Sequence, residues 1–407
     1  AGNGDVGFVI GGNNEELNFY FSKNDFWKSK PGYPDGGVFL PGGLNINIPS
    51  MKGTEFYAEQ RLSDATIMMK MKHEVSDLTL KAWVASSENI VVLEFQNQGS
   101  PVQVNLDLWS QTGNESVNKS GSEDGLSWIT RSFTGPELEW PTEIAIAMKV
   151  TEENQSSFIL TDRPVKVILG FCTNHELGDF LETAINITSE TNDKILSNLR
   201  ETHEQWWSDF WSRSWIDIGD DFLEQCYYGS QYLLASCSRN AAFPPGLWGN
   251  SLTEDASFYN WAGDYHLNYN HQAPWWGAYS SNHIELTDPY DTPILEYMDN
   301  AKTHASTLLN IMGVYYPVGI GPKGFCSSRF PLDSLAMKKY YGTYENNIEG
   351  GIMFLGQKSN NLFCTANMFM RFYSTYDSTY ATRVYPFLKE VANFWRDYLV
   401  FEDGRYI

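Results

Sequence analysis

Cysteine is scarce in this sequence, and its spacing fits no metal-binding motif. The 407 residues include five Cys, at positions 172, 226, 237, 326 and 364, and no two of them form a Cys-x-x-Cys pair. An odd and widely spaced set excludes a zinc ribbon and a disulfide-dense scaffold. One or two disulfide bridges stay open at this point.

Basic residues are also few. Lys and Arg number 28 against 50 Asp and Glu, which gives a net charge of -22. Such a chain repels the phosphate backbone of nucleic acid, so nucleic-acid binding is excluded as a predicted function. The acidic residues are spread along the chain without a block of like charge, as on a well-solvated surface. No apolar run is long enough to cross a bilayer, so we expect no membrane insertion.

Signatures of several enzyme classes are missing as well. The sequence has no Gly-x-Ser-x-Gly nucleophile elbow, and GIGPKG at 319–324 lacks the Gly-Lys-Ser/Thr ending of a phosphate loop. His266, His271 and His283 are five and twelve residues apart, which does not match the i, i+4 spacing of a helical zinc pair. We therefore predict no metal and no cofactor.

The sequence starts without Met inside the strand-like run AGNGDVGFVIGG, and a removed signal peptide is one explanation. Four sequons, at Asn114, Asn118, Asn154 and Asn186, would accept glycans in a chain secreted from a eukaryote. Sequons arise often by chance in Asn- and Ser-rich chains, so they favour secretion only weakly. The expected location is extracellular, or periplasmic in a bacterium.

Two kinds of periodicity divide the chain. Over 1–176, short runs such as LNFYFS, LTLKAWVAS and VQVNLDLWS alternate apolar and polar residues between Gly, Asn and Pro, which predicts a large antiparallel β-sandwich. Residues 177–214 carry apolar residues three and four apart, which predicts a linker of one long helix or two joined ones. Further helices are expected at about 221–238, 293–312, 361–376 and 380–400, separated by long Gly- and aromatic-rich connections.

The richest stretch is GDYHLNYNHQAPWW at 263–276. It places two Asn, two His, one Asp, two Tyr and two Trp in fourteen positions, and eight of the 14 Trp lie between Trp206 and Trp276. Hydrogen-bonding groups beside flat apolar rings suit a polar ligand with apolar faces, and sugars are such ligands.

Several motifs resemble glycoside hydrolase family 95, whose members include inverting α-L-fucosidases and which falls among the (α/α)6-barrel glycosidases. The similar segments are GNGDVG at 2–7, NDFW at 24–27, WWSDFWSRSWIDI at 206–218, PPGLWGNSL at 244–252, the Asn-x-Asn stretch at 261–286, and YPFLKEVANFWRDYLVFEDGRYI at 385–407. The resemblance implies a β-sandwich, a linker helix and an (α/α)6-barrel catalytic domain over 215–407 that is incomplete in this chain.

Asn268 and Asn270 are the predicted catalytic residues. They are two apart, so both amides point the same way if the segment is extended. By resemblance, the pair holds and polarises the attacking water of an inverting hydrolysis, supported by a carboxylate further along than this chain extends. The other interpretation is loop structure, since Asn side chains cap turns.

Other residues are predicted to bind the sugar. Trp248, Trp275 and Trp276 can stack on a pyranose, although the last two cannot both face one cleft in an extended segment, so one of them is expected in the core. The predicted polar contacts are Asp264, His266, His283 and Glu349. Asp264 equally suits the cap of a turn, and the histidines equally suit structural positions, whereas hydroxyl recognition is favoured over metal.

An inverting glycosidase also needs a protonated carboxylic acid across the scissile bond from the water. The resemblance places this acid beyond Ile407, so the remaining C-terminal part of the same protein is an expected partner. Within the chain, no Glu stands in a motif that calls for the acid.

The sequence thus predicts a glycosidase that removes a terminal sugar, α-L-fucose or α-L-galactose by resemblance, from extracellular oligosaccharides. The alternative is a catalytically inactive relative that acts as a carbohydrate-binding or structural protein. Phosphorolysis on the same fold is disfavoured, because no basic cluster surrounds the Asn-x-Asn segment.

Overall fold

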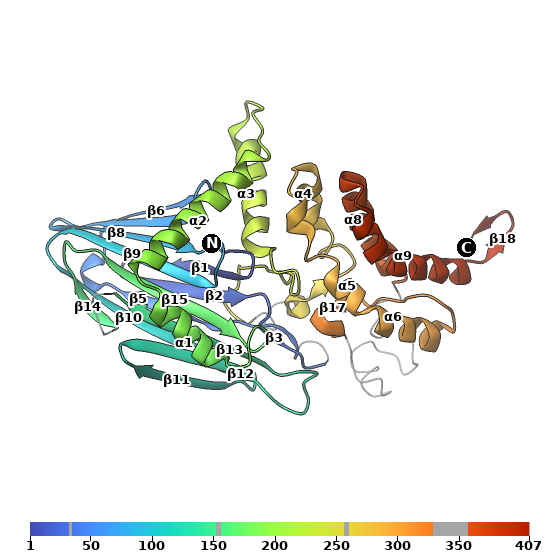
Figure 1. The fold of residues 1–407 in the computed structure, drawn as a ribbon, viewed down its shortest axis with the longest axis horizontal. Helices are drawn as coiled ribbons and strands as arrows, with labels where there is room; N and C mark the ends of the chain where they lie inside the picture. Colours follow the sequence, from blue (N-terminus) through green and yellow to red (C-terminus); the bar gives the residue numbers. More distant parts are fainter. Residues whose placement is uncertain (32–34, 152–155, 256–259, 329–356, 407) are drawn as a thin grey trace.

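The computed structural model describes residues 1–31, 35–151, 156–255, 260–328 and 357–406. A β-rich half is followed by a helical half, and the two lie side by side (Figure 1). The predicted fold class, an antiparallel β-sandwich followed by a helical domain, is confirmed.

Two antiparallel sheets form the sandwich. One has the order β1-β2-β5-β10-β14 and the other β11-β12-β13-β15-β9-β8-β7-β6. The strands of the first are β1 (Val6–Gly12), β2 (Glu16–Lys23), β5 (Gly42–Asn47), β10 (Val102–Ser110) and β14 (Ser157–Leu160). Those of the second are β11 (Val117–Glu123), β12 (Leu126–Phe133), β13 (Thr142–Val150), β15 (Val165–Thr173), β9 (Ile90–Gly99), β8 (Ser76–Val84), β7 (Thr66–Lys72) and β6 (Glu55–Arg61). The pair β3 (Trp27–Lys28) and β4 (Gly37–Val38) lies outside both sheets.

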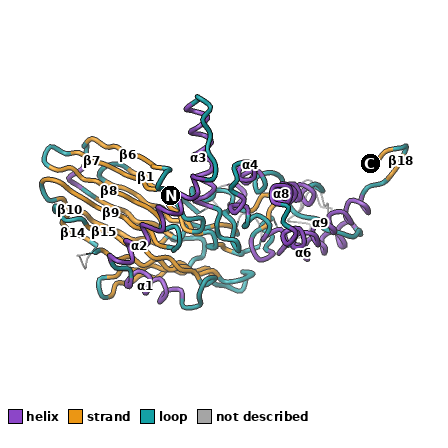
Figure 2. Tube along the Cα trace, turned by 45° about the horizontal axis from the view of Figure 1, so that its top comes forward, coloured by secondary structure: helices purple, strands orange, loops and turns teal. Residues whose placement is uncertain are grey.

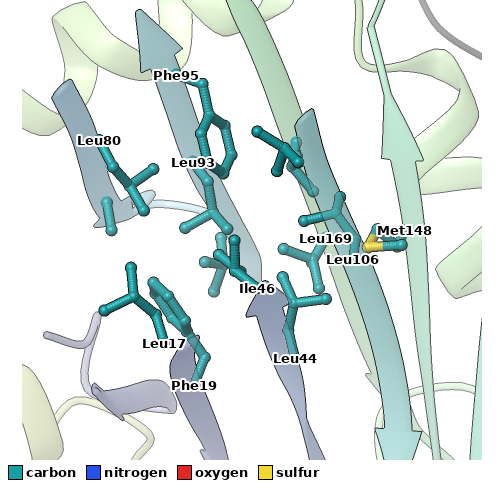
Figure 3. Packing of buried hydrophobic residues seen from close by; sticks show 14 of the residues in the cluster. Leu17, Phe19, Leu44, Ile46, Leu80, Leu93, Phe95, Leu106, Met148 and Leu169 are labelled. Carbon is teal, nitrogen blue, oxygen red and sulfur yellow. The ribbon is translucent and has the colours of Figure 1, made fainter. Parts of the chain in front are cut away.

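Alternating apolar residues of the two sheets meet in one core. Phe19 and Leu44 of the first sheet and Leu93 and Leu169 of the second are each fully buried in the same cluster (Figure 3). Successive side chains of a strand point to opposite faces, so the period-two pattern of the sequence delivers one apolar side chain in two to this core. Each such burial contributes about 1.5–3 kcal/mol before entropy is subtracted.

The predicted linker is two helices, α1 (Phe180–Glu190) and α2 (Asp193–Ser212), and both pack on the outer face of the eight-stranded sheet (Figure 2). The Asn192 side chain separates them, because it accepts hydrogen bonds from the backbone N–H of Lys194 and Ile195, both at 3.1 Å, and so caps α2. Leu196 and Leu199 of α2 join a small core on the sheet.

The helical half contains helices of 5 to 21 residues joined by structured loops. Its helices are α3 (Asp221–Cys237), α4 (Trp276–Ser280), α5 (Thr292–Glu296), α6 (Met298–His304), α8 (Asn360–Thr375) and α9 (Ser378–Tyr398). Its short strand pairs are β16 (Tyr265–His266) with β17 (Gly319–Ile320), and β18 (Phe401–Glu402) with β19 (Arg405–Tyr406). Within the described residues, no helix is long and apolar enough to cross a membrane.

Three of the four predicted helices in this half are confirmed to within two residues, as α3, α8 and α9. The prediction of one helix over 293–312 is wrong. The chain there breaks into α5, α6 and a π turn, and the left-handed backbone of Asn310 (φ 56°) ends it. All five cysteines are free thiols, so the disulfide bridges left open by the sequence do not form.

Two of the motifs that carry the family resemblance meet where the halves join. Gly7 of β1 lies against Asn250, since a Cβ at position 7 would be 2.3 Å from the Asn250 Cγ. The Asn250 amide in turn donates to the Ser236 carbonyl of α3 at 2.6 Å. Position 7 therefore requires Gly, because the Asn250 side chain approaches its backbone closely. Through Asn250, the sandwich, α3 and the 244–252 loop are in contact with one another.

A buried ion pair joins Asp255, three residues after this loop, to the sandwich. The Arg131 guanidinium of β12 donates to both carboxylate oxygens of Asp255, at 2.7 and 3.2 Å, and the two side chains are 0% and 3% exposed. The Leu40 backbone N–H also donates to Asp255, at 3.1 Å. A bidentate pair with an additional hydrogen bond satisfies charges that would otherwise be costly to bury.

Asp255→Ala is expected to lower the free energy of unfolding by about 3–5 kcal/mol, because the Arg131 guanidinium is left buried without its carboxylate. The double variant Arg131→Met/Asp255→Leu removes both charges and is expected to recover most of this loss. Urea unfolding followed by tryptophan fluorescence measures both. The control Glu15→Ala breaks an exposed pair with Lys52 (3.0 Å) and should cost less than about 1 kcal/mol. Equal losses in the control and in Asp255→Ala would contradict the assigned role.

Candidate functional site

The chain enters the Asn-x-Asn segment through an unusual turn. Trp261, Ala262 and Gly263 are all left-handed, with φ of 70°, 52° and 67°. Non-glycine residues pay a steric cost in this region, and such strain persists only where the surroundings hold it. Here they do: the Leu247 backbone N–H donates to the Gly263 carbonyl at 2.9 Å, and a Cβ at Gly37 would lie 2.1 Å from the Ala262 carbonyl oxygen.

Asn268 and Asn270 lie in a tight turn, so the assumption of an extended segment is wrong. The His271 backbone N–H donates to the His266 carbonyl at 2.9 Å, and the Gln272 N–H donates to the Tyr269 carbonyl at 3.0 Å. These bonds reverse the chain directly after the two-residue strand β16. The two amides therefore do not share one side of a strand, and their positions must be described separately.

A cavity of about 330 Å³ opens between α3, the loop at 245–251 and this turn. Four predicted residues lie in its wall, namely Trp248, Asp264, Asn270 and Trp275. Among the described residues, the wall does not include Asn268, which is half-buried in the same turn. The structure thus brings together one amide, one carboxylate and two indoles.

Asp264 and His266 form a buried pair. The His266 Nδ1 lies 2.7 Å from the Asp264 Oδ1, and the Ser327 hydroxyl donates to the other carboxylate oxygen. Burial raises the pKa of Asp264, and the hydrogen bonds from His266 and Ser327 oppose the rise. Gly319 makes room for this pair, since a Cβ there would lie 2.1 Å from the Asp264 Oδ2.

The Asp264 bond fixes His266 in one orientation. With Nδ1 turned to the carboxylate, only Nε2 can face a ligand. The imidazole ring lies against the ring of Trp261, with centroids 4.9 Å apart, and Trp261 is 44% exposed. Both carboxylate oxygens of Asp264 already accept hydrogen bonds from other side chains. A role as a turn cap or as a direct sugar contact is therefore an incomplete description of Asp264.

Trp275 and Trp276 face different surroundings. Trp275 is 1% exposed, and its indole N–H donates to the Leu286 carbonyl at 2.9 Å. Trp276 is half-buried and donates to the Asn367 carboxamide of α8 at 3.0 Å. Only the first contributes to the cavity wall among the described residues, and it does so from a core position.

His283 lies away from the cavity. Its ring is fully buried and stacks on Phe210 of α2, with centroids 3.8 Å apart and an interplanar angle of 13°. Its Nδ1 is 3.5 Å from Glu285, which pairs with Arg213 at 2.7 Å. The predicted sugar contact is therefore not supported by its position. Glu349 lies outside the described residues.

The predicted glycosylation sites differ in accessibility. The Asn114 Nδ2 donates to the buried Asp255 carboxylate, and the Asn118 Nδ2 donates to Ser110 Oγ and the Gln111 carbonyl, both at 2.7 Å. A glycan on either atom would displace these bonds, so the structure argues against both sites. Asn186 is exposed on α1, and Asn154 lies outside the described residues.

Sequence reasoning missed Trp261 and Ser327, and it weighed His271 for hydroxyl recognition without naming it among the predicted sugar contacts. His271 lines the cavity and stacks on Tyr290, with centroids 4.9 Å apart. Ser327 is 63 residues from Asp264, so no local pattern could find it. In the described part of the chain, no group of three or more His, Cys, Asp or Glu side chains could hold a metal ion.

Comparison with known proteins supports the resemblance. Residues 217–407 match the family model described as Glycosyl hydrolase family 95 catalytic domain. The "Probable alpha-fucosidase A" of Aspergillus niger (strain ATCC MYA-4892 / CBS 513.88 / FGSC A1513) is 26% identical over 200 residues, which cover 47% of this chain and 22% of that protein. The predicted likeness to family 95 is confirmed.

A solved structure shares the fold. The "Putative kojibiose phosphorylase from human microbiome" superposes with a TM-score of 0.62 at 11% identity, covering 97% of this chain and 57% of that chain. At this identity the likeness concerns the fold alone. The chain spans less than two thirds of the length of both the Aspergillus niger protein and the phosphorylase.

The pKa of His271 generates a prediction about stability. Burial lowers this pKa to about 4, against about 6.5 in the unfolded chain, so between these values the unfolded state binds more protons. Stability should therefore fall as the pH drops from about 6.5 towards 4, by on the order of 3 kcal/mol for this group. His271→Gln should remove that part of the pH dependence.

Urea unfolding at about pH 7 and about pH 4.5 measures the difference. His73→Gln, which changes an exposed histidine, is the matched control and should leave the pH dependence as it is. An unchanged pH dependence in His271→Gln would show that the buried imidazole is not the group responsible.

Proposed function

We propose that the protein is a glycosidase that removes a terminal sugar by inversion, with α-L-fucose or α-L-galactose as the target. One observation carries this proposal: Asn270, Asp264 and Trp248 converge on one cavity within the segment that matches family 95. An amide, a carboxyl group and an indole suit hydroxyl groups and the apolar face of a pyranose.

Each residue has a role in the proposed reaction. Asn270 holds the attacking water through its amide oxygen, and Asn268 assists from the same turn. Asp264 positions His266, whose Nε2 contacts a sugar hydroxyl. Trp248, 37% exposed at the cavity wall, stacks on the ring. The general acid and the carboxylate behind the asparagines remain predictions, since the resemblance puts both after Ile407.

The substrate is expected outside the cytoplasm. Terminal fucosyl and galactosyl groups occur on oligosaccharides that a secreted or periplasmic enzyme would meet. The exposed sequon Asn186 is the remaining glycosylation candidate on a described surface. Its hydroxyl residue, Thr188, is fully buried and donates to the Ala184 carbonyl at 2.7 Å, so glycan attachment there requires local opening of α1.

A second candidate function is carbohydrate binding without turnover. It is favoured by a specific observation: among the described residues, Asp264 is the only carboxylate that lines the cavity, and both of its oxygens are bonded to other side chains. A carboxyl group so engaged is a poor proton donor to a leaving group.

Aryl α-L-fucosides, α-L-galactosides and, as a control, α-D-glucosides separate these functions. The substrates are offered to the 407-residue chain and to a form that continues past Ile407, with and without inorganic phosphate. Release of β-configured sugar, followed by proton NMR, supports an inverting hydrolase. Turnover that needs phosphate, or binding of fucosyl oligosaccharides without turnover in either form, would overturn the proposal.

Asn270→Ala is expected to lower kcat by about 10²–10³-fold in the active form, as loss of one preorganised polar group in a catalytic site does. Asn268→Ala should have the smaller effect, because only Asn270 is in the described cavity wall. Initial rates on the aryl glycoside measure both, and Tyr385→Ala, an exposed aromatic on α9, is the control. A rate loss in Asn268→Ala greater than in Asn270→Ala would refute the assignment.

A further inference from the structure

A second hollow lies on the sandwich, on the outer face of the eight-stranded sheet. It measures about 660 Å³, twice the size of the cavity beside Asn270, and strands β6 to β9 form its floor. We call it the sheet groove. At the opposite end of β6 and β7, Ala65 packs against Trp207 and Phe210. The sheet groove therefore occupies the end of the sandwich remote from the helical half (Figure 1).

The strand register aligns the floor of the sheet groove in rows. Tyr57 pairs with Lys70, Lys70 with Thr79, and Thr79 with Gln96. At the spacing of neighbouring strands, this row is about 14 Å long. One exposed aromatic ring thus begins a line of three polar side chains.

A second row runs beside the first. Glu55 pairs with Lys72, Lys72 with Asp77, and Asp77 with Gln98. Taken together, the two rows contain two Lys and two acidic residues, so their formal charges cancel.

The polar side chains of the two rows make few hydrogen bonds or ion pairs with the rest of the protein. Among the described residues, their one hydrogen bond or ion pair runs from the Tyr57 hydroxyl to Glu59 Oε2, at 3.2 Å. Further along the same face, Arg61 of β6 lies 3.6 Å from Glu59 in an ion pair. Donors and acceptors of the sheet groove are therefore available to a ligand.

The floor beneath these side chains is rigid. Residues that alternate with the rows, such as Met71, Leu78 and Phe95, are at most 1% exposed and belong to the main core. Because the pleat fixes the direction of each side chain, the spacing of the polar groups is set by the sheet. Sites on such elements are more precise than sites on loops.

We propose that the sheet groove binds a neutral polysaccharide, with the Tyr57 ring stacked on one sugar. Tyr57 is 53% exposed, which leaves a face of the ring free for the apolar side of a pyranose. Amide, hydroxyl, ammonium and carboxylate groups in a charge-neutral set match a ligand that has many hydroxyl groups and no charge. The assignment to carbohydrate rests on the proposed function, and the site is separate from the cavity beside Asn270.

Affinity gel electrophoresis of the chain in gels containing xyloglucan, galactomannan or polygalacturonate tests the proposal. We expect retardation by at least one of the two neutral polymers and none by polygalacturonate. Tyr57→Ala should weaken binding about tenfold, and Tyr57→Phe, which keeps the ring, should restore it. Tyr385→Ala is the control for loss of an exposed tyrosine, and circular dichroism checks that each variant folds.

Three outcomes would overturn the proposal: no retardation by a neutral polymer, equal retardation of Tyr57→Ala and the unaltered chain, or a dimer that Tyr57→Ala dissociates, since β6 is also an edge strand. The proposed function can fail separately. If the form that continues past Ile407 is inactive on every aryl glycoside while Tyr57-dependent binding persists, the sheet groove stands and the glycosidase assignment falls. If turnover is confirmed without Tyr57-dependent binding, the reverse holds.

Discussion

The candidate site depends on the burial of one carboxylate, that of Asp255, which pairs with Arg131 of the sandwich. Asp255 follows the loop at 245–251, which includes Trp248 and Gly249 of the cavity wall. The same loop fixes the left-handed turn at Gly263 by a backbone hydrogen bond from Leu247. Sandwich and helical half are therefore coupled, because the sandwich supplies the counter-charge that keeps a loop of the site in place.

Elements with a strong period could be predicted from the sequence. The runs LNFYFS and VQVNLDLWS became β2 and β10, since one buried side chain in two is a property that each strand carries alone. The helices α8 and α9 followed for the equivalent reason. The interval at 293–312 could not be predicted, because its apolar side chains are divided among helices that turn relative to one another. The breaks between these helices arise from tertiary packing, which the spacing of apolar residues along the sequence does not encode.

Some residues of the cavity wall could be predicted from their residue types, whereas their geometry could not. Asn270, Asp264 and Trp248 were found because Asn, Asp and Trp are dense in two short stretches, and the structure brings these three to one cavity. The same density of polar residues led to the prediction of His283 as a sugar contact. The structure instead stacks its ring on Phe210, which is on a helix of the linker. Ser327 was missed because its relation to Asp264 exists only after residues 63 apart have come together.

Burial gives the cavity an electrostatic character that agrees with an uncharged ligand. The pKa of Asp264 is raised and that of His271 is lowered to about 4, and in both cases desolvation is the main cause. Each shift favours the neutral form of the group concerned. A phosphate or a metal ion would require the opposite, a cluster of cations or of ionised ligands. The proposed ligand, a sugar whose hydroxyl groups both donate and accept, would need only oriented dipoles, and the cavity wall contains the Asn270 amide and the Asp264 carboxyl group.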